Sequence, residues 1–291
     1  MAEATTETVA TTYDDAEMAE ELTEQEKEEV HKRVRPRAVV VLETIRAEGE
    51  LELHRPVAAL AWSGLAAGLS MGFSLVTMGA IRAVLPDTPW RPLLVKLGYC
   101  VGFLIIIIGR QQLFTENTLT PIIPLLHNRD LATLKRVLRL WGVVLVTNLV
   151  GAFAVALTMG ATNAFPPIIR EQFAALASEA LTGSFGDQFL RAIFSGWLIA
   201  LIVWLMPNAE TSRVFVIVML TYVIGLCGLS HIVAGSVEVF YAAVTSGTTF
   251  VDVVWRFLVP VLLGNLLGGA ALVGAIHHAQ IEADKGSHHA A

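Results

Sequence analysis

The stretch that decides how this chain is organised is VGFLIIIIGRQQLFTENTLTPIIPLL, residues 101–126. It is long enough to cross a membrane, because about 20 apolar residues in a helix cover the roughly 30 Å of hydrocarbon in a bilayer. The polar run 110–117 interrupts it at membrane depth. Backbone that leaves a helix there must be buried in protein or line a polar cavity, because each unpaired N–H or C=O group costs several kcal/mol in lipid. We therefore predict a membrane-spanning helix that breaks inside the protein.

A second stretch has the same form, since the apolar run VIVMLTYVIGL, residues 216–226, is followed by the polar and small residues of 227–236. Both broken stretches belong to a set of apolar spans joined by short connections, the exception being 161–187. The spans cover residues 57–84, 93–126, 138–160, 188–206, 213–245 and 254–277. The fold class that follows is an all-α integral membrane protein with six transmembrane helices, of which the second and the fifth are broken.

Composition supports the membrane assignment and excludes several classes of function. Of the 291 residues, 54% are hydrophobic and 16% are charged, whereas soluble domains have about 25% charged residues. The sequence contains no phosphate-binding loop, dinucleotide fingerprint or nucleophile constellation, so we expect neither an enzyme nor a bound cofactor, and no nucleic-acid partner. Cys100 and Cys227 lie in apolar spans without metal-ligand spacing, which predicts two buried free thiols and no metal site.

The two ends of the chain differ from its apolar part. Residues 1–31 hold eleven of the 26 acidic residues and one basic residue, which predicts a disordered acidic tail. Residues 32–56 mix basic and apolar residues at helical spacing, which predicts an amphipathic helix along the membrane surface. The spans occupy 57–280, and 281–291 form a second tail. Lysine and arginine in the flanks favour the side of the N-terminus by thirteen to six, so we expect both termini to be cytoplasmic.

The third and sixth spans share a motif at a distance of 117 residues. This shift lays NLVGA at 148–152 on NLLGG at 265–269, and it places Thr115 in the first break opposite Ile232 in the second. A repeat of three spans must lie inverted in the membrane, because three is an odd number. Broken spans at matching positions of two halves point to a solute site near the bilayer midplane. We therefore predict two inverted three-helix repeats around a central path.

His231 is the candidate functional residue of the second break, because no other histidine lies deep within a predicted span. Ionisable groups at membrane depth are functional hypotheses by default, and histidine is the side chain that most readily exchanges a proton near neutral pH. The alternative is a structural core histidine. Thr115 of the first break is its expected hydrogen-bond partner.

Arg110, Glu116 and Glu238 are the other charges at this depth. One reading is that these buried charges pair with one another and with freed backbone groups. The other reading is that Arg110 supplies positive potential for an anion.

Taken together at these spacings, the motifs resemble the formate/nitrite transporter family over about 57–280. The motifs that carry the likeness are Leu113-Phe114-Thr115, Asn148-Leu-Val-Gly-Ala152, His231 and Gly264-Asn265-Leu-Leu-Gly-Gly269. The resemblance implies an aquaporin-like fold, a homopentamer with one pore per protomer, and a place in a bacterial inner membrane. It implies passage of small monovalent anions or their conjugate acids, such as formate, nitrite or hydrosulfide, with a possible proton link through the pore histidine.

The resemblance also implies roles for individual residues. Thr115 contacts the central His231, Phe103 and Tyr99 form the cytoplasmic constriction, and Phe114 lies near the centre of the pore. Leu113, Asn148 and Asn265 complete the set of expected pore or substrate-binding residues.

The sequence departs from the family pattern at the outer mouth. Many members have a lysine before the fourth span, whereas 161–190 contains Arg170 as its one base, and Glu238 and Arg110 are additions. Two other functions therefore stay open. The missing lysine favours a pore for a small neutral solute such as water or ammonia. The acidic tail and the basic surface helix suit a membrane scaffold whose pore is vestigial.

Overall fold

The computed structural model describes residues 23, 38–274 and 279. The predicted tail 281–291 lies outside the described residues, as does the predicted tail 1–31 apart from residue 23. The helices are α3 (Ala38–His54), α4 (Val57–Val84), α5 (Arg91–Val95), α6 (Cys100–Ile108), η1 (Glu116–Thr118), α7 (Ile122–Asn128), α8 (Leu131–Ala161), α9 (Pro167–Ala180), α10 (Phe185–Leu205), η2 (Met206–Asn208), α11 (Arg213–Leu226), α12 (Ile232–Thr245), α13 (Phe250–Val253), η3 (Val254–Leu258), α14 (Val259–Leu266) and η4 (Leu267–Gly274).

Five helical segments of the described chain are long and apolar enough to cross a membrane. They are Val57–Val84, Arg91–Ile108, Leu131–Ala161, Phe185–Asn208 and Phe250–Ala271. The expected fifth span, 213–245, instead consists of two shorter apolar helices, α11 and α12. The prediction of an all-α protein with apolar helices of membrane length is confirmed. Its arrangement as six spans in two repeats stays a prediction.

The helix ends around the two polar stretches have local causes. After Gly109, Arg110 adopts a left-handed conformation with φ of 51°, and the next helical turn begins only at η1. In the second stretch, Gly228 has φ of 61°, and α12 starts at Ile232. A left-handed residue ends a helix because the following N–H groups no longer point along the axis. The chain therefore leaves helical geometry at 109–115 and again at 227–231.

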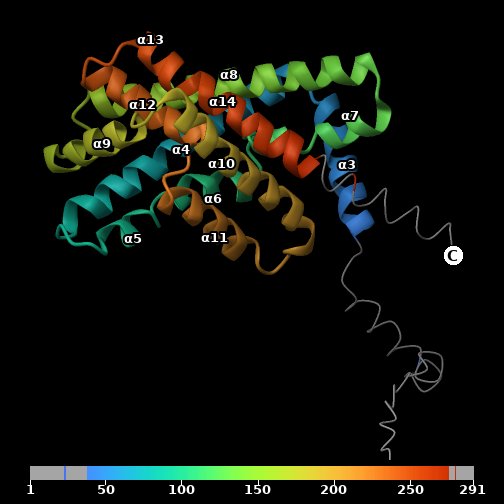
Figure 1. Ribbon diagram of the computed structural model, residues 1–291, viewed down its shortest axis with the longest axis horizontal. Helices are drawn as coiled ribbons and strands as arrows, with labels where there is room; N and C mark the ends of the chain where they lie inside the picture. The colour runs from blue at the N-terminus through green and yellow to red at the C-terminus, as the bar shows by residue number, and fades with distance from the viewer. Residues whose placement is uncertain (1–22, 24–37, 275–278, 280–291) are drawn as a thin grey trace, which may run out of the picture. The chain divides into compact units, whose positions relative to one another are not determined.

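The long connection 161–187 contains the helix α9. Proline is favoured in the first turn of a helix, and Pro167 is the first residue of α9. Phe173 of α9 is fully buried, and its ring lies 5.7 Å from that of Tyr241 in α12. Figure 1 shows α9 at the same end of the helical body as α12 and α13, while α3 and α7 lie at the other end.

The helix α3 covers part of the span predicted as an amphipathic surface helix. Its residues Val41, Leu42 and Ile45 are buried, and they form one cluster with Leu119 and Ile123 of the segment around α7. The apolar face that the sequence assigned to the membrane surface is therefore packed on the protein itself.

Two helix pairs approach each other with backbone against backbone. A Cβ atom at Gly68 of α4 would overlap the carbonyl oxygen of Asn148 in α8, and a Cβ at Gly196 of α10 would overlap that of Asn265 in α14. Small residues are what allow this approach between membrane helices. The approach brings the side chains of both asparagines next to the two polar stretches.

Candidate pore site

His231 and Thr115 meet where the two polar stretches come together. The Nε2 atom of His231 lies 2.7 Å from the Oγ1 atom of Thr115, and both side chains are buried. His231 is the N-cap residue of α12, where its Nδ1 atom accepts a hydrogen bond of 3.1 Å from the backbone N–H of Ala234. A side chain in this position satisfies a donor that would otherwise be unpaired at the start of the helix.

These two contacts determine which ring nitrogen of His231 carries the proton. Because Nδ1 accepts from Ala234, the neutral ring has its hydrogen on Nε2 and donates it to Thr115. The Thr115 hydroxyl then keeps its own hydrogen, and within the described residues no protein group accepts it. The pair therefore presents a free O–H donor beside the histidine.

Asn148 holds the first polar stretch in place. Its Oδ1 atom accepts from the backbone N–H of Phe114 at 2.9 Å. Its Nδ2 atom donates to the carbonyl oxygens of Gln112 at 2.9 Å and Gly64 at 2.8 Å. The amide side chain thus replaces helix hydrogen bonds that the stretch has lost, which fixes the backbone on both sides of Leu113.

Asn265 acts in the same way on the second polar stretch. Its Oδ1 atom accepts from the N–H of Ile232 at 2.8 Å, and its Nδ2 atom donates to the carbonyl oxygens of Ala192 at 2.8 Å and Ser230 at 3.2 Å. On these contacts Phe114, rather than Thr115, corresponds to Ile232. The predicted pairing of Thr115 with Ile232 was therefore wrong by one residue. It was taken from the motifs in the third and sixth spans, and the chain between polar stretch and motif is one residue longer in the first half than in the second.

Both asparagines were expected to line the pore. Asn148 and Asn265 are instead completely buried, with their amide groups occupied by backbone partners. They position the polar stretches that contain Thr115 and His231.

A cavity of about 310 Å³ leads from His231 toward the α9 end of the helical body. We call this cavity the α9 vestibule. Its titratable and charged lining side chains include Lys96, Tyr99, Glu179, Arg191, His231 and Glu238. The vestibule therefore combines a polar, charged entrance with the histidine at its inner end.

Tyr99 and Phe103 lie on the vestibule side of the histidine. The Phe103 ring is 5.0 Å from that of His231 and 5.3 Å from that of Tyr99, and Tyr99 lines the α9 vestibule. In the orientation predicted from the sequence, α9 belongs to the outer side. The aromatic pair lies at the α9 end of the helical body, where α6 begins, so its assignment to the cytoplasmic constriction is inconsistent with that predicted orientation.

Leu113 and Phe114 flank Thr115 on the chain and are both buried. The Phe114 ring packs edge-on at 6.3 Å from Trp141, whose Nε1 atom donates to the carbonyl oxygen of Asn117 at 2.7 Å. These contacts hold the first polar stretch against α8.

The three charges expected at depth do not form one group. Arg110 has an 87% exposed side chain, and its nearest acidic partner is Glu48 of α3 at 3.8 Å. Glu116 is half-buried in η1, and Glu238 is half-buried in the α9 vestibule. The prediction of mutual pairing was wrong, because Arg110 follows the end of α6 and points outward. Arg110 is accordingly not a source of potential inside the protein.

Lys96 is a basic residue at the α9 vestibule that the sequence analysis did not expect there. It comes from the turn between α5 and α6 rather than from the segment before α10, and it lines the α9 vestibule with Arg191. No local pattern marks Lys96 in the sequence, since its position at the vestibule depends on how α6 packs against α4 and α11.

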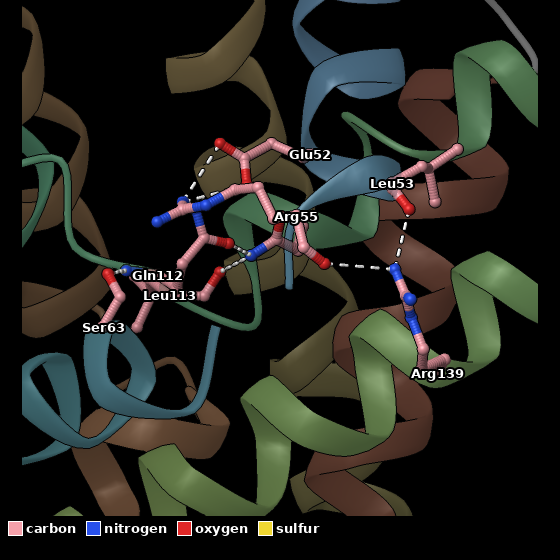
Figure 2. Close-up of polar contacts among 8 residues, drawn as sticks. Glu52, Leu53, Arg55, Ser63, Gln112, Leu113 and Arg139 are labelled. Atoms are coloured by element: carbon pink, nitrogen blue, oxygen red, sulfur yellow. Dashed lines mark hydrogen bonds and ion pairs between the residues drawn. The ribbon is translucent and has the colours of Figure 1, made fainter. Parts of the chain in front are cut away.

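Figure 2 shows how the end of α3 is tied to the first polar stretch. Gln112 donates from Nε2 to Glu52 at 3.0 Å and from its backbone N–H to the Ser63 hydroxyl at 3.1 Å. Arg139 of α8 donates to the carbonyl oxygen of Leu53 at 2.7 Å. The stretch is thus anchored on the side opposite the α9 vestibule by α3, α4 and α8.

The two cysteines differ in exposure. Cys100 is buried as expected, whereas Cys227, the C-cap residue of α11 next to the left-handed Gly228, is exposed. Among the described residues no group of three or more His, Cys, Asp or Glu side chains is arranged to hold a metal ion.

A polar centre between two non-helical stretches, reached through a charged vestibule, is typical of membrane channels and transporters. The formate/nitrite transporter family model matches residues 39–279, and the chain belongs to this family. The inner membrane protein YfdC of Escherichia coli (strain K12) is 40% identical over 252 residues, which are 87% of this chain and 81% of that protein. The formate channel BtFdhC of Bacillus thuringiensis is 26% identical, covering 82% of this chain and 93% of the channel.

Solved structures share the fold. A structure described as an FNT family ion channel matches with a TM-score of 0.73 and 19% identity, over 83% of this chain and 99% of that one. A pentameric formate channel with formate bound matches with a TM-score of 0.65 and 23% identity, over 77% of this chain and 97% of that one. The protein is an integral membrane protein of a transport family whose named relatives are channels and transporters.

Proposed function

We propose that this protein is an inner-membrane channel for small monovalent anions or their conjugate acids, with formate, nitrite and hydrosulfide as the substrates to test first. The observation that carries the proposal is the 2.7 Å contact between His231 and Thr115 at the inner end of the α9 vestibule. An anion needs hydrogen-bond donors where it sheds water, and the free Thr115 hydroxyl hydrogen is such a donor.

We further propose six spans arranged as two inverted repeats, with both termini cytoplasmic. The matched contacts support this arrangement, since Gly68 meets Asn148 as Gly196 meets Asn265. The two asparagines also bind the backbone of their respective polar stretches through the same amide atoms. The description of one structural neighbour as pentameric supports a homopentamer with one pore per protomer.

Proton linkage through His231 stays a hypothesis with a defined structural requirement. Nδ1 is occupied by the Ala234 N–H, so the ring gains a second proton only if that hydrogen bond opens. The arrangement therefore favours hydrogen-bond donation to the solute in the resting state, with proton transfer requiring a movement at the start of α12.

The experiment that tests the function uses proteoliposomes containing the full-length protein. Uptake of formate, nitrite and hydrosulfide is compared with osmotic water flux and ammonia flux at pH 5.5 and pH 8, against protein-free liposomes. We expect saturable anion uptake above the protein-free rate. Flux of water or ammonia alone would favour the neutral-solute pore, and no flux of any solute would favour the scaffold.

A His231→Asn variant separates the two roles of the histidine. Asparagine keeps a polar side chain of similar size but does not titrate. If His231 transfers protons, the variant loses the dependence of flux on pH between about 5 and 8, the range in which histidine normally changes charge. If His231 only donates a hydrogen bond, flux changes in size while its pH profile keeps its form. Thr115→Val, which removes the hydroxyl donor, should lower anion flux in either case.

A further inference from the structure

The α9 vestibule contains two charged side chains for which the described residues provide no hydrogen bond and no ion pair. Glu179 forms an ion pair with Arg82 at 2.6 Å, and Arg191 donates to the carbonyl oxygen of Thr182 at 3.2 Å. For the side chains of Lys96 and Glu238, by contrast, the described part of the chain provides no hydrogen bond and no ion pair, although both line the cavity. Both are half-buried. Their charges therefore act on each other and on whatever occupies the vestibule.

The position of Glu238 relative to the histidine follows from helix geometry. His231 is the N-cap of α12, and Glu238 lies seven residues later in the same helix. Seven residues are almost two full turns, so both side chains lie on one face, with about 10 Å between them along the axis. Each lines the α9 vestibule. A solute in this cavity therefore lies within reach of the charge of Glu238 when it approaches His231.

We propose that Glu238 is a specificity-determining residue, whose carboxylate weakens the attraction of the α9 vestibule for anions and so favours uncharged solutes over charged ones. This inference rests on the proposed function. Lys96 has the opposite effect, and the balance between the two unpaired groups sets how strongly an anion is concentrated in front of His231. The other charged or titratable groups that face this space are Tyr99, Glu179, Arg191, Cys227 and His231.

The size of the effect follows from Coulomb's law. A unit charge at about 10 Å, with an effective dielectric constant of about 20 to 40, changes the local concentration of a monovalent anion roughly 4- to 15-fold. Charges in a cavity with low-dielectric walls act on ions in this way, whereas a neutral molecule does not experience the field to the same extent. A variant that neutralises Glu238 should therefore change anion flux and leave the flux of a neutral isostere unchanged.

The test compares formate with formamide, its neutral isostere, in proteoliposomes at pH 8. We expect Glu238→Gln to raise formate uptake about 4- to 15-fold and to leave formamide flux unchanged, while Lys96→Gln lowers formate uptake. The matched control is Glu171→Gln, which removes the same charge from the exposed surface of α9 outside the vestibule and should leave both fluxes unchanged. The effect of Glu238→Gln should shrink as ionic strength rises, because mobile ions screen the charge.

Two results would overturn the inference. One is a Glu238→Gln variant with wild-type formate uptake. The other is a variant in which formate and formamide fluxes change by the same factor, as expected if Glu238 only supports the structure. Failure of the proposed function and failure of the role of Glu238 give different results. A wild-type protein without formate uptake would refute both. A wild-type protein that takes up formate, together with a Glu238→Gln variant that takes it up equally fast, would refute the role of Glu238 alone.

Discussion

Replacing Asn148 by leucine tests the idea that one amide side chain holds the first polar stretch in place. Leucine is close to asparagine in size but makes no hydrogen bonds. The variant loses the contacts of Asn148 with the N–H of Phe114 and with the carbonyl oxygens of Gln112 and Gly64. The side chain is fully buried, so water does not replace these partners.

The expected loss of stability follows from counting the groups left unpaired. Gly64 lies inside α4, so its carbonyl oxygen keeps a helix hydrogen bond. Within the described residues, nothing but Asn148 pairs with the N–H of Phe114 or the carbonyl oxygen of Gln112. Each buried unpaired group costs about 1–3 kcal/mol, so two such groups give a loss of about 2–6 kcal/mol. Hydrogen bonds measured between membrane helices average about 0.6 kcal/mol, which favours the lower half of this range.

The assay has a stability readout and a transport readout. The free energy of unfolding is measured in mixed micelles for wild type, for Asn148→Leu and for Asn163→Leu, a control in the exposed connection between α8 and α9. We expect the control to resemble wild type, and Asn148→Leu to lose both stability and anion flux, because Thr115 follows Phe114 directly. A free energy of unfolding of Asn148→Leu within about 0.5 kcal/mol of the wild-type value would refute the reasoning. The N–H of Phe114 and the carbonyl oxygen of Gln112 would then have found other partners.

Three further experiments test separate parts of the structure. Gly68→Ala should destabilise the protein by about 1–3 kcal/mol, because the new methyl group overlaps backbone that cannot move aside. Gly142→Ala in α8 is the control: a Cβ added there has no neighbouring atom within 4 Å, and the change should stabilise α8 by about 0.5–1 kcal/mol. Equal effects of the two variants on thermal unfolding would contradict the close approach of α4 and α8. The pKa of Asp130, the N-cap of α8, is lowered from 3.8 by hydrogen bonds from the side chain and the N–H of Thr133. Its carboxylate therefore stabilises the folded protein above pH 3.8 and loses this contribution as the pH falls below that value, a loss that Asp130→Asn should not show in the same titration of stability. Cys227 should react with a water-soluble thiol reagent and Cys100 should not, and labelling both at equal rates would show that the burial of Cys100 is incorrect.

Much of the architecture follows from local properties of the sequence. Runs of about 20 apolar residues can be read directly, because the cost of placing a residue in hydrocarbon depends mainly on its own side chain. The polar interruptions are visible for the same reason, and the sequence alone suggested that Thr115 and His231 face each other. Their side chains lie 2.7 Å apart in the structure. Their role in transport remains a prediction.

Other features depend on contacts between distant segments and are not visible in the local sequence. Lys96 at the α9 vestibule is one example. It comes from the turn between α5 and α6, whereas the family resemblance led us to look for a lysine before the fourth span. Arg110 is another, since a single left-handed residue turns its side chain outward to Glu48 instead of into the interior. In both cases the direction of one side chain is set by backbone geometry and packing, which the hydrophobic pattern does not encode.

The sequence by itself determined that the chain crosses a membrane, where its apolar stretches are interrupted, and which polar residues lie in the interruptions. Only the tertiary structure decided how the breaks are held, since Asn148 and Asn265 were expected in the pore and instead bind backbone. It also decided the register of the two breaks, which differs by one residue from the helical motif. The physical reason is that burial in lipid is a property of each residue, whereas hydrogen bonds between segments depend on the distance and angle at which the packed helices bring two particular atoms together.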